Sequence, residues 1–252
     1  MAKKLADLTT LQSAELAERQ PSCAILSVGS VEPHGPHLPL GTDTLISERA
    51  AEDAARVLEE RGVTCVIAPS VPYGVTNFAE GFSGAIGVPA EALTLLLRSI
   101  CERLLHDGWS HVAIVNNHLE PAHDSAVRAA IVDLPVGRAS VSCPLTRRWG
   151  RTLSDEFKRG NCHAGRYETS LVLAVDPSRA PKENLPTLEI SLSDGIKAGK
   201  GTFREMGMVN AYTGAPSEAT PEEGNALYEK LRDMIVAEVS EALAQSGIFS
   251  MK

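Results

Sequence analysis

Gly29-Ser-Val-Glu-Pro-His-Gly-Pro-His-Leu-Pro-Leu-Gly-Thr-Asp43 follows directly on a short apolar run, Cys23-Ala-Ile-Leu-Ser-Val28. The apolar run predicts a buried β-strand. The longer stretch holds one glutamate, two histidines and one aspartate among three glycines and three prolines. Because proline cannot donate a backbone hydrogen bond, this stretch predicts a stiff loop rather than a helix or a central strand. Open α/β sheets bind their ligands where such loops leave the carboxyl ends of strands.

Strand and helix patterns alternate along the rest of the chain. Apolar runs without polar alternation are typical of strands whose two faces are both covered by helices. We therefore predict a three-layer α/β/α sandwich with a mostly parallel central sheet, as a single domain over residues 1–252. The strands are expected at 23–28, 63–68, 111–115 and 137–143, and the helices at 5–19, 44–60, 89–104, 121–132, 165–175 and from 221 onward.

Two segments fall outside this alternation. Residues 69–87 predict a long loop with three aromatic side chains, which we expect to form a wall of the functional site. Segment 176–219 is rich in proline, glycine and polar residues and predicts no definite element. Thr220, Pro221 and Glu223 stand at the N-cap, N1 and N3 positions and predict a capping box for the last helix.

Composition excludes several classes of protein. The 252 residues carry a net charge of −8, which argues against nucleic-acid binding because phosphate neutralisation needs clustered lysine and arginine. The five cysteines are widely spaced and include no Cys-x-x-Cys, which favours buried free thiols in a reducing compartment. The amino terminus lacks the apolar region of a signal peptide, and no stretch approaches the length of a membrane span. We therefore expect a cytoplasmic protein.

Two groups of potential metal ligands follow two predicted strands. Glu32, His34 and Asp43 follow strand 23–28, and His118 and Glu120 follow strand 111–115. If those strands are neighbours, three carboxylates and two imidazoles converge, a donor set that suits Zn²⁺, Mn²⁺ or Fe²⁺. Five ligands exceed the need of one catalytic zinc and fit two divalent ions about 3.5 Å apart with a bridging hydroxide. Such a hydroxide attacks amide carbonyls.

The same residues allow plainer interpretations. His34 and His37 are nearly interchangeable by composition, so spacing does not choose between them. His118 is equally a satisfied loop histidine, and Glu120 a helix N-terminal acid interacting with the helix dipole. A protein that binds metal without turnover therefore stays an alternative to a hydrolase.

Further candidates surround this set. His163 lies among small and polar residues, and its ordinary pKa near neutrality suits a proton shuttle. Glu168, five residues on, is a candidate to orient His163 or a ligand. His123, Trp149 and Tyr73 are candidate substrate contacts. Cys162 lacks any context that lowers a thiol pKa, so a cysteine nucleophile is disfavoured.

These motifs resemble the creatininase (creatinine amidohydrolase) family. The matching segments are Gly29–Asp43, Tyr73–Gly84, Asn116-Asn-His-Leu-Glu120 and His163-Ala-Gly-Arg-Tyr-Glu-Thr-Ser170, with a looser match at Gly214–Gly224. The resemblance implies an α/β/α metallohydrolase with two divalent ions per subunit, usually a homohexamer. It further implies that Glu32, Asp43 and His118 hold one ion, that His34, Asp43 and Glu120 hold the other, and that His163 passes a proton to the leaving nitrogen.

The chain departs from the family where substrate is bound. Creatinine-hydrolysing members place a tryptophan and a glutamate shortly before the catalytic histidine, whereas Phe157-Lys-Arg-Gly-Asn-Cys162 has neither. Trp149 stands where their other substrate tryptophan is expected, but on a shorter segment. We therefore expect a metal-dependent hydrolase of a C–N bond other than a peptide bond, in an amide, cyclic amide or formamide other than creatinine. The resemblance also implies an alternative, a peptidase that trims a peptide-derived cofactor.

Overall fold

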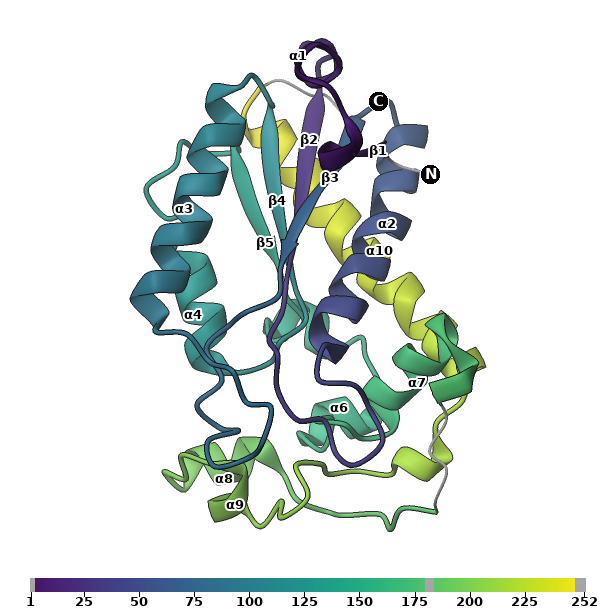
Figure 1. Cartoon of the computed structure of the whole chain (residues 1–252). Coiled ribbons are helices and arrows are strands. Elements are labelled where there is room, and N and C mark those ends of the chain that lie inside the picture. The colour runs from purple at the N-terminus through teal and green to yellow at the C-terminus, as the bar shows by residue number, and fades with distance from the viewer. Residues whose placement is uncertain (1–2, 180–183, 248–252) are drawn as a thin grey trace.

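The computed structural model describes residues 3–179 and 184–247, so the ends of the predicted 1–252 domain lie outside the described residues. Its centre is a five-stranded sheet in the order β1-β3-β2-β4-β5, and every strand pair is parallel. Figure 1 shows this sheet between helices. The strands are β1 (Lys3–Lys4), β2 (Ser22–Val28), β3 (Thr64–Val71), β4 (His111–Asn116) and β5 (Ala139–Ser142).

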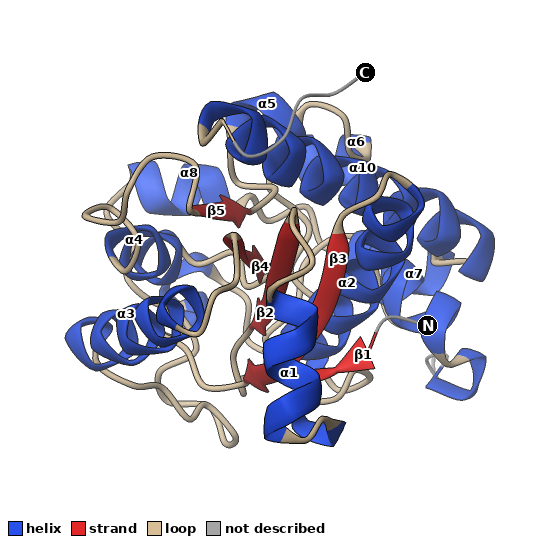
Figure 2. Ribbon diagram, turned by 90° about the horizontal axis from the view of Figure 1, so that it is seen from above, coloured by secondary structure: helices blue, strands red, loops and turns tan. Residues whose placement is uncertain are grey.

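Helices cover both faces of the sheet. Seen from above in Figure 2, α3 and α4 lie on one side and α2 and α10 on the other. Alternate residues of β2 face the two layers, since Cys23 and Ile25 pack with α2 and α10, whereas Ala24 and Leu26 pack with α1, α3 and α4. The helices are α1 (Thr10–Ala17), α2 (Thr42–Glu60), α3 (Ala90–His106), α4 (Pro121–Ala129), α5 (Arg147–Gly150), α6 (Asp155–Arg159), α7 (Arg166–Val175), α8 (Leu192–Lys197), α9 (Phe203–Met206) and α10 (Pro221–Gln245). The predicted three-layer α/β/α sandwich is confirmed.

The register of the central strands brings three loops to one edge. Val28 at the end of β2 pairs with Val71 of β3 on one side and Asn116 of β4 on the other. The chain therefore leaves all three strands at the same level. In Figure 1 these loops meet α6, α8 and α9 at the lower end of the molecule.

Several predicted boundaries differ from the structure. The helix expected at 44–60 begins at Thr42, so Asp43 lies in its first turn, where the helix dipole favours a carboxylate. The helix expected at 5–19 is a 3₁₀ turn followed by α1, because Thr9 and Gln12 form a capping box that starts a new helix. Four short helices, α5, α6, α8 and α9, were not predicted because four to six residues show no periodicity.

The capping box expected at Thr220 is only half formed. The Thr220 hydroxyl accepts a hydrogen bond from the Glu223 N–H, as predicted. The Glu223 carboxylate, however, accepts from Arg166 and from the Ser170 hydroxyl of α7. Ser170 Oγ accepts from the Thr220 N–H at 3.1 Å and thus replaces the missing half of the box. The start of α10 is therefore fixed to α7. Among the described residues, no helix is long and apolar enough to cross a bilayer.

Close packing of α10 on α7 yields a stability prediction. A Cβ on Gly224 would lie 1.9 Å from the Ser170 carbonyl oxygen, so Gly224→Ala must displace one helix. Overpacking costs about 1–3 kcal/mol, and a contact this short with backbone belongs to the upper part of that range, above the gain of about 1 kcal/mol in helix propensity. We expect a lower midpoint in urea denaturation. Gly201→Ala is a control without the clash, since Gly201 lies outside the helices and its Cβ would lie 3.6 Å from Glu205; equal midpoints for both variants would contradict the packing argument.

Candidate metal centre

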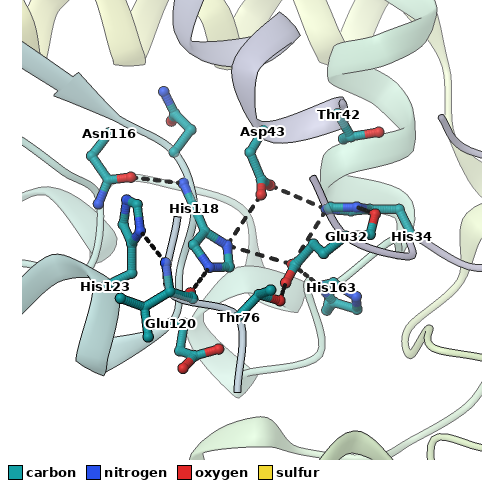
Figure 3. A network of polar contacts seen from close by, with 12 residues as sticks. Glu32, His34, Thr42, Asp43, Thr76, Asn116, His118, Glu120, His123 and His163 are labelled. Carbon is teal, nitrogen blue, oxygen red and sulfur yellow. Dashed lines mark hydrogen bonds and ion pairs between the residues drawn. The ribbon is translucent and has the colours of Figure 1, made fainter. Parts of the chain in front are cut away.

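The five predicted metal ligands converge at the edge of the sheet. Glu32 and His34 come from the loop after β2, Asp43 from the first turn of α2, and His118 and Glu120 from the loop after β4 (Figure 3). Each is at most 3% exposed. The loop after β2 folds back on itself, since the Glu32 N–H donates to Leu40 O and the turn passes through Gly35 at φ +67°.

Asp43 stands between two histidines and shows a different oxygen to each. Its Oδ1 lies 3.1 Å from His34 Nε2, and its Oδ2 lies 3.1 Å from His118 Nδ1. Although Oδ2 is buried, it accepts no hydrogen bond of acceptable geometry from a described residue. A carboxylate that bridges two cations uses one oxygen for each. The placement of Asp43 matches that arrangement.

Backbone carbonyls fix the ring orientation of both histidines. His34 Nδ1 lies 3.1 Å from Glu32 O, and His118 Nε2 lies 2.7 Å from Val75 O. Because a carbonyl only accepts, each of these nitrogens carries the proton, and the other nitrogen points to Asp43. Metal-binding histidines are typically held in this way. The donor set and its orientation therefore fit divalent cations.

Two further carboxylates are held in place by the loop after β3. Thr76 Oγ1 donates to Glu32 Oε2, while Glu32 Oε1 lies 3.4 Å from His118 Nδ1. The Glu120 carboxylate accepts from the N–H groups of Asn77 and Phe78 at 3.1 and 3.2 Å. The long loop thus lies against the cluster, as expected for a wall of the site.

Glu168 also belongs to this cluster of potential ligands. The sequence did not predict Glu168 as a ligand position. Its Oε2 lies 3.5 Å from His34 Nε2 and accepts from the Ala164 N–H at 2.6 Å. Among residues 3–179 and 184–247, ligand atoms close enough to hold one ion form three sets: Glu32, His34 and His163; Glu32, His118 and Glu120; and His34, Asp43 and Glu168. The structure therefore groups Glu120 with His118, and Glu168 with His34, a division that differs from the one implied by the family resemblance.

The carboxylates and imidazoles of the cluster change one another's pKa values. Burial would lower the pKa of His34, but Asp43, Glu168 and Glu32 outweigh burial and raise the pKa to about 10. The same balance raises the pKa of His118 well above its ordinary value. Burial, offset in part by His34, raises the pKa of Glu168 to about 8. In the ion-free protein, two imidazolium groups thus supply positive charge that bound cations would replace.

His163 stands beside the cluster with one ring nitrogen available. Its Nε2 lies 3.0 Å from Pro33 O and so carries the proton, while Nδ1 lies 3.8 Å from Glu32 Oε1. The ring packs on Phe203, with centroids 4.3 Å apart. Burial and the nearby His34 lower its pKa to about 4, below the near-neutral value expected from the sequence, so the ring is neutral and Nδ1 is a free acceptor.

A narrow pocket opens onto these groups. Phe78, Leu192 and Phe203 form apolar parts of its lining beside Glu32, Glu120, His163 and Glu168. Cys162 also lines it, but burial raises its pKa well above the usual range, so the thiol stays protonated. This agrees with the prediction that Cys162 is no nucleophile.

The structure separates the remaining histidine candidates. His37 lies outside the cluster, with its Nε2 3.0 Å from Thr169 Oγ1. His123 is buried behind His118, with ring centroids 4.6 Å apart, and its Nδ1 accepts from the Val75 N–H. Burial and His118 lower the pKa of His123 to about 3. His34 is therefore the histidine of the loop after β2 that lies among the potential ligands. His123 packs behind His118 and does not line the pocket.

Two other predicted substrate contacts are not brought to the pocket. Tyr73 is 47% exposed and lines a separate groove with Pro72 and Leu96. Trp149 lies in α5, where its Nε1 donates to Glu238 at 2.6 Å. The sequence did not indicate Thr76 or Phe203, because neither belongs to a recognisable motif. Thr76 acts through a single hydroxyl, and Phe203 comes from the segment 176–219, for which no element was predicted.

A family model described as creatinine amidohydrolase matches residues 6–239 of this chain. The chain belongs to the creatininase family. The matched range includes every residue of the cluster.

The chain is similar to curated peptide peptidases and to one curated hydrolase of a different substrate. The mycofactocin precursor peptide peptidase of Mycolicibacterium smegmatis is 31% identical over 89% of this chain and 86% of its own length. The protein of the same name from Mycobacterium tuberculosis is 29% identical over 95% of this chain and 92% of its own length. The 3-dehydro-scyllo-inosose hydrolase of Thermotoga maritima is 27% identical over 83% of this chain and 70% of its own length.

Solved creatininases share the fold. A structure named Creatininase Mn has a TM-score of 0.68 at 18% identity and covers 96% of this chain and 98% of that chain. A mutant creatininase of Zn-Zn type has a TM-score of 0.67 at 17% identity, with the same coverage of both chains. Those enzymes bind manganese or zinc. The family match and the curated relatives identify this chain as a hydrolase that acts on carbon–nitrogen bonds.

The separate positions of His34 and His37 give a direct test of the metal assignment. We expect His34→Ala to lower the metal content per subunit, because it removes the nitrogen that faces Asp43 and Glu168. His37→Ala, the matched control, is expected to keep the wild-type content. Elemental analysis of both variants measures this metal content. A wild-type metal content in His34→Ala would show that His34 is not a metal ligand.

The raised pKa values predict a pH-dependent metal affinity. Since carboxylates raise the pKa of His34 to about 10, a cation must displace its proton throughout the range from pH 6 to 9. Mn²⁺ affinity should therefore rise with pH, by about tenfold per unit for each proton displaced. Calorimetric titration in buffers of different ionisation enthalpy measures both the affinity and the protons released. An affinity that does not change with pH would contradict this electrostatic description.

Proposed function

We propose that the chain is a dinuclear metal-dependent amidohydrolase. The observation that supports it most is Asp43, which shows one carboxylate oxygen to His34 and the other to His118. Since both rings are fixed by carbonyl oxygens, this arrangement would suit two cation positions that share Asp43, which supports the proposal. A structural zinc site would use four closed ligands, commonly thiolates, and no cysteine belongs to the three ligand sets.

The residues divide into two proposed positions that share Asp43. Glu32, His118 and Glu120 would complete one, and His34 and Glu168 the other, with zinc, manganese or iron as the ion. When bound, such ions supply Lewis-acid polarisation of a carbonyl and activation of water near neutral pH. Glu120 and Glu168 are held by backbone N–H groups, so little reorganisation is needed on binding.

His163 is the proposed proton carrier. Its neutral ring presents Nδ1 beside Glu32 and within the pocket, so it can accept a proton from the attacking water. It then delivers this proton to the leaving nitrogen, which must be protonated for the C–N bond to break. The contacts with Pro33 and Phe203 keep the ring in place for both transfers.

A peptide amide is the favoured substrate class. Its specific support is that the curated relatives at 29–31% identity are peptide peptidases. The chain also lacks the tryptophan and glutamate that creatinine-hydrolysing members place before the catalytic histidine. Hydrolysis of formamides, lactams and short peptides by ion-free and metal-restored protein tests the proposal. Metal-loaded protein that cleaves none of them would favour a metal-binding protein without turnover.

Removal of the proton carrier should separate catalysis from metal binding. We expect His163→Ala to retain metal and fold but to lose about 10² or more in turnover, the usual contribution of general acid–base catalysis. His106→Ala, a substitution at an exposed histidine of α3, serves as the control. Steady-state kinetics with elemental analysis checks both. An unchanged rate in His163→Ala would remove this residue from the mechanism.

Three further proposals concern the domain, the assembly and the location: the homohexamer rests on the family resemblance, and the cytoplasmic location on the five buried free cysteines. We infer a single creatininase-like domain over residues 1–252, assembly as a homohexamer and a cytoplasmic location. Light scattering of the purified chain measures the assembly.

A further inference from the structure

A second, larger groove adjoins the pocket of the metal centre. We call it the basic groove; its volume is about 700 Å³, and α5, α6 and α8 contribute to its walls. Leu119, Cys162 and Leu192 line both this groove and the metal-centre pocket. A substrate held at the metal centre can therefore extend past these three side chains into the basic groove.

The basic groove is named for its charge. Arg147, Arg151, Lys158 and Lys197 line it, and none of its lining residues is acidic. The chain as a whole has a net charge of −8, so a surface with four cations and no carboxylate differs from the rest of the molecule. Clefts that gather one sign of charge concentrate ligands of the opposite sign.

The cations of the basic groove are free to bind a ligand. Arg151 Nε donates to Arg147 O, but neither guanidinium pairs with a carboxylate of any described residue. Lys158 and Lys197 pair with Asp155 and Asp194, at 2.8 and 3.1 Å, on the exposed surface. Exposed ion pairs of this kind contribute little to stability. Both lysines can therefore leave these aspartates and bind a ligand at a small cost in free energy.

Apolar side chains lie among these cations. Leu145 and Ile196 line the basic groove and are 38% and 39% exposed, and Phe157 is half-buried beside them. The occupant must therefore combine a negative group with apolar groups. A peptide segment that carries a carboxylate meets this requirement, because a guanidinium can bind a carboxylate with two parallel hydrogen bonds.

We propose that the basic groove binds a carboxylate of the peptide substrate, so that the enzyme selects acidic peptides for cleavage at the metal centre. This inference rests on the proposed amidohydrolase function. The carboxylate can belong to the C-terminus of the peptide or to an acidic side chain, which have the same chemistry in this groove. Arg147 and Arg151 are its primary partners, because they have no carboxylate partner of their own among the described residues.

The test uses three N-acetylated hexapeptides of otherwise equal apolar sequence: one with a free C-terminus, one with a C-terminal amide, and one amidated peptide with a glutamate. We expect metal-loaded wild-type protein to prefer a carboxylate-bearing peptide over the neutral one by about tenfold in kcat/KM, mainly through KM. The preference should fall as salt is added. Whether the free C-terminus or the glutamate is preferred tells which carboxylate is bound.

Charge-removal variants locate the preference in the groove. The double substitution Arg147→Ala and Arg151→Ala should abolish the tenfold preference, whereas Arg159→Ala should retain it. Arg159 is a matched control, since it is exposed, neighbours Lys158 in α6 and does not line the groove. Equal cleavage of all three peptides, or a preference that survives in the double variant, would overturn the proposal.

Direct binding separates this inference from the proposed function. If no peptide is cleaved, the peptidase assignment fails, and fluorescence anisotropy of the same three sequences, with an N-terminal fluorophore in place of the acetyl group, then decides about the groove. Tighter binding of a carboxylate-bearing peptide that is lost in the double variant would support the proposal. Equal binding of the neutral and acidic peptides would refute it.

Discussion

The structure depends on the mutual compensation of charge in one buried cluster. Glu32, Asp43, Glu120 and Glu168 are all nearly inaccessible to solvent. Carboxylates cannot be buried together unless positive charge or hydrogen-bond donors accompany them. Here the imidazoles of the cluster, backbone N–H groups and the Thr76 hydroxyl supply that compensation. Without cations the cluster holds protons instead, which the raised pKa of His34 shows.

The fold supplies the geometry that this cluster requires. Because β2 and β4 are adjacent and parallel, the loops that carry Glu32 and His118 leave the sheet at the same level. The start of α2 then places Asp43 between them, where the helix dipole adds positive potential. Outer contacts hold each ligand: Val75 O orients His118, and the N–H groups of the loop after β3 hold Glu120. The centre is thus formed by elements that are far apart along the chain.

The proposed chemistry and the proposed selectivity involve different parts of the molecule. Glu32, His34, His118 and Glu120 lie on the loops after β2 and β4, whereas the short helices α5, α6 and α8 contribute to the walls of the basic groove. Short helices between long elements can change in sequence without disturbing the sheet. This separation is consistent with a family in which a common metal centre serves different substrates, and it explains why the creatinine-specific residues are replaced without loss of the ligands.

The sequence by itself determined the layered fold, the two ligand-bearing loops and the identity of His34, His118 and Asp43 as candidates, because these features are local: apolar runs, prolines and residue spacing are visible along the chain. Only the tertiary structure decided between His34 and His37, brought Glu168 to His34, and placed Tyr73 and Trp149 away from the pocket. It also showed Thr76, Phe203 and the basic groove. The reason is physical: these contacts join residues tens to more than a hundred positions apart, and side-chain direction across such separations is set by packing, which no local pattern encodes.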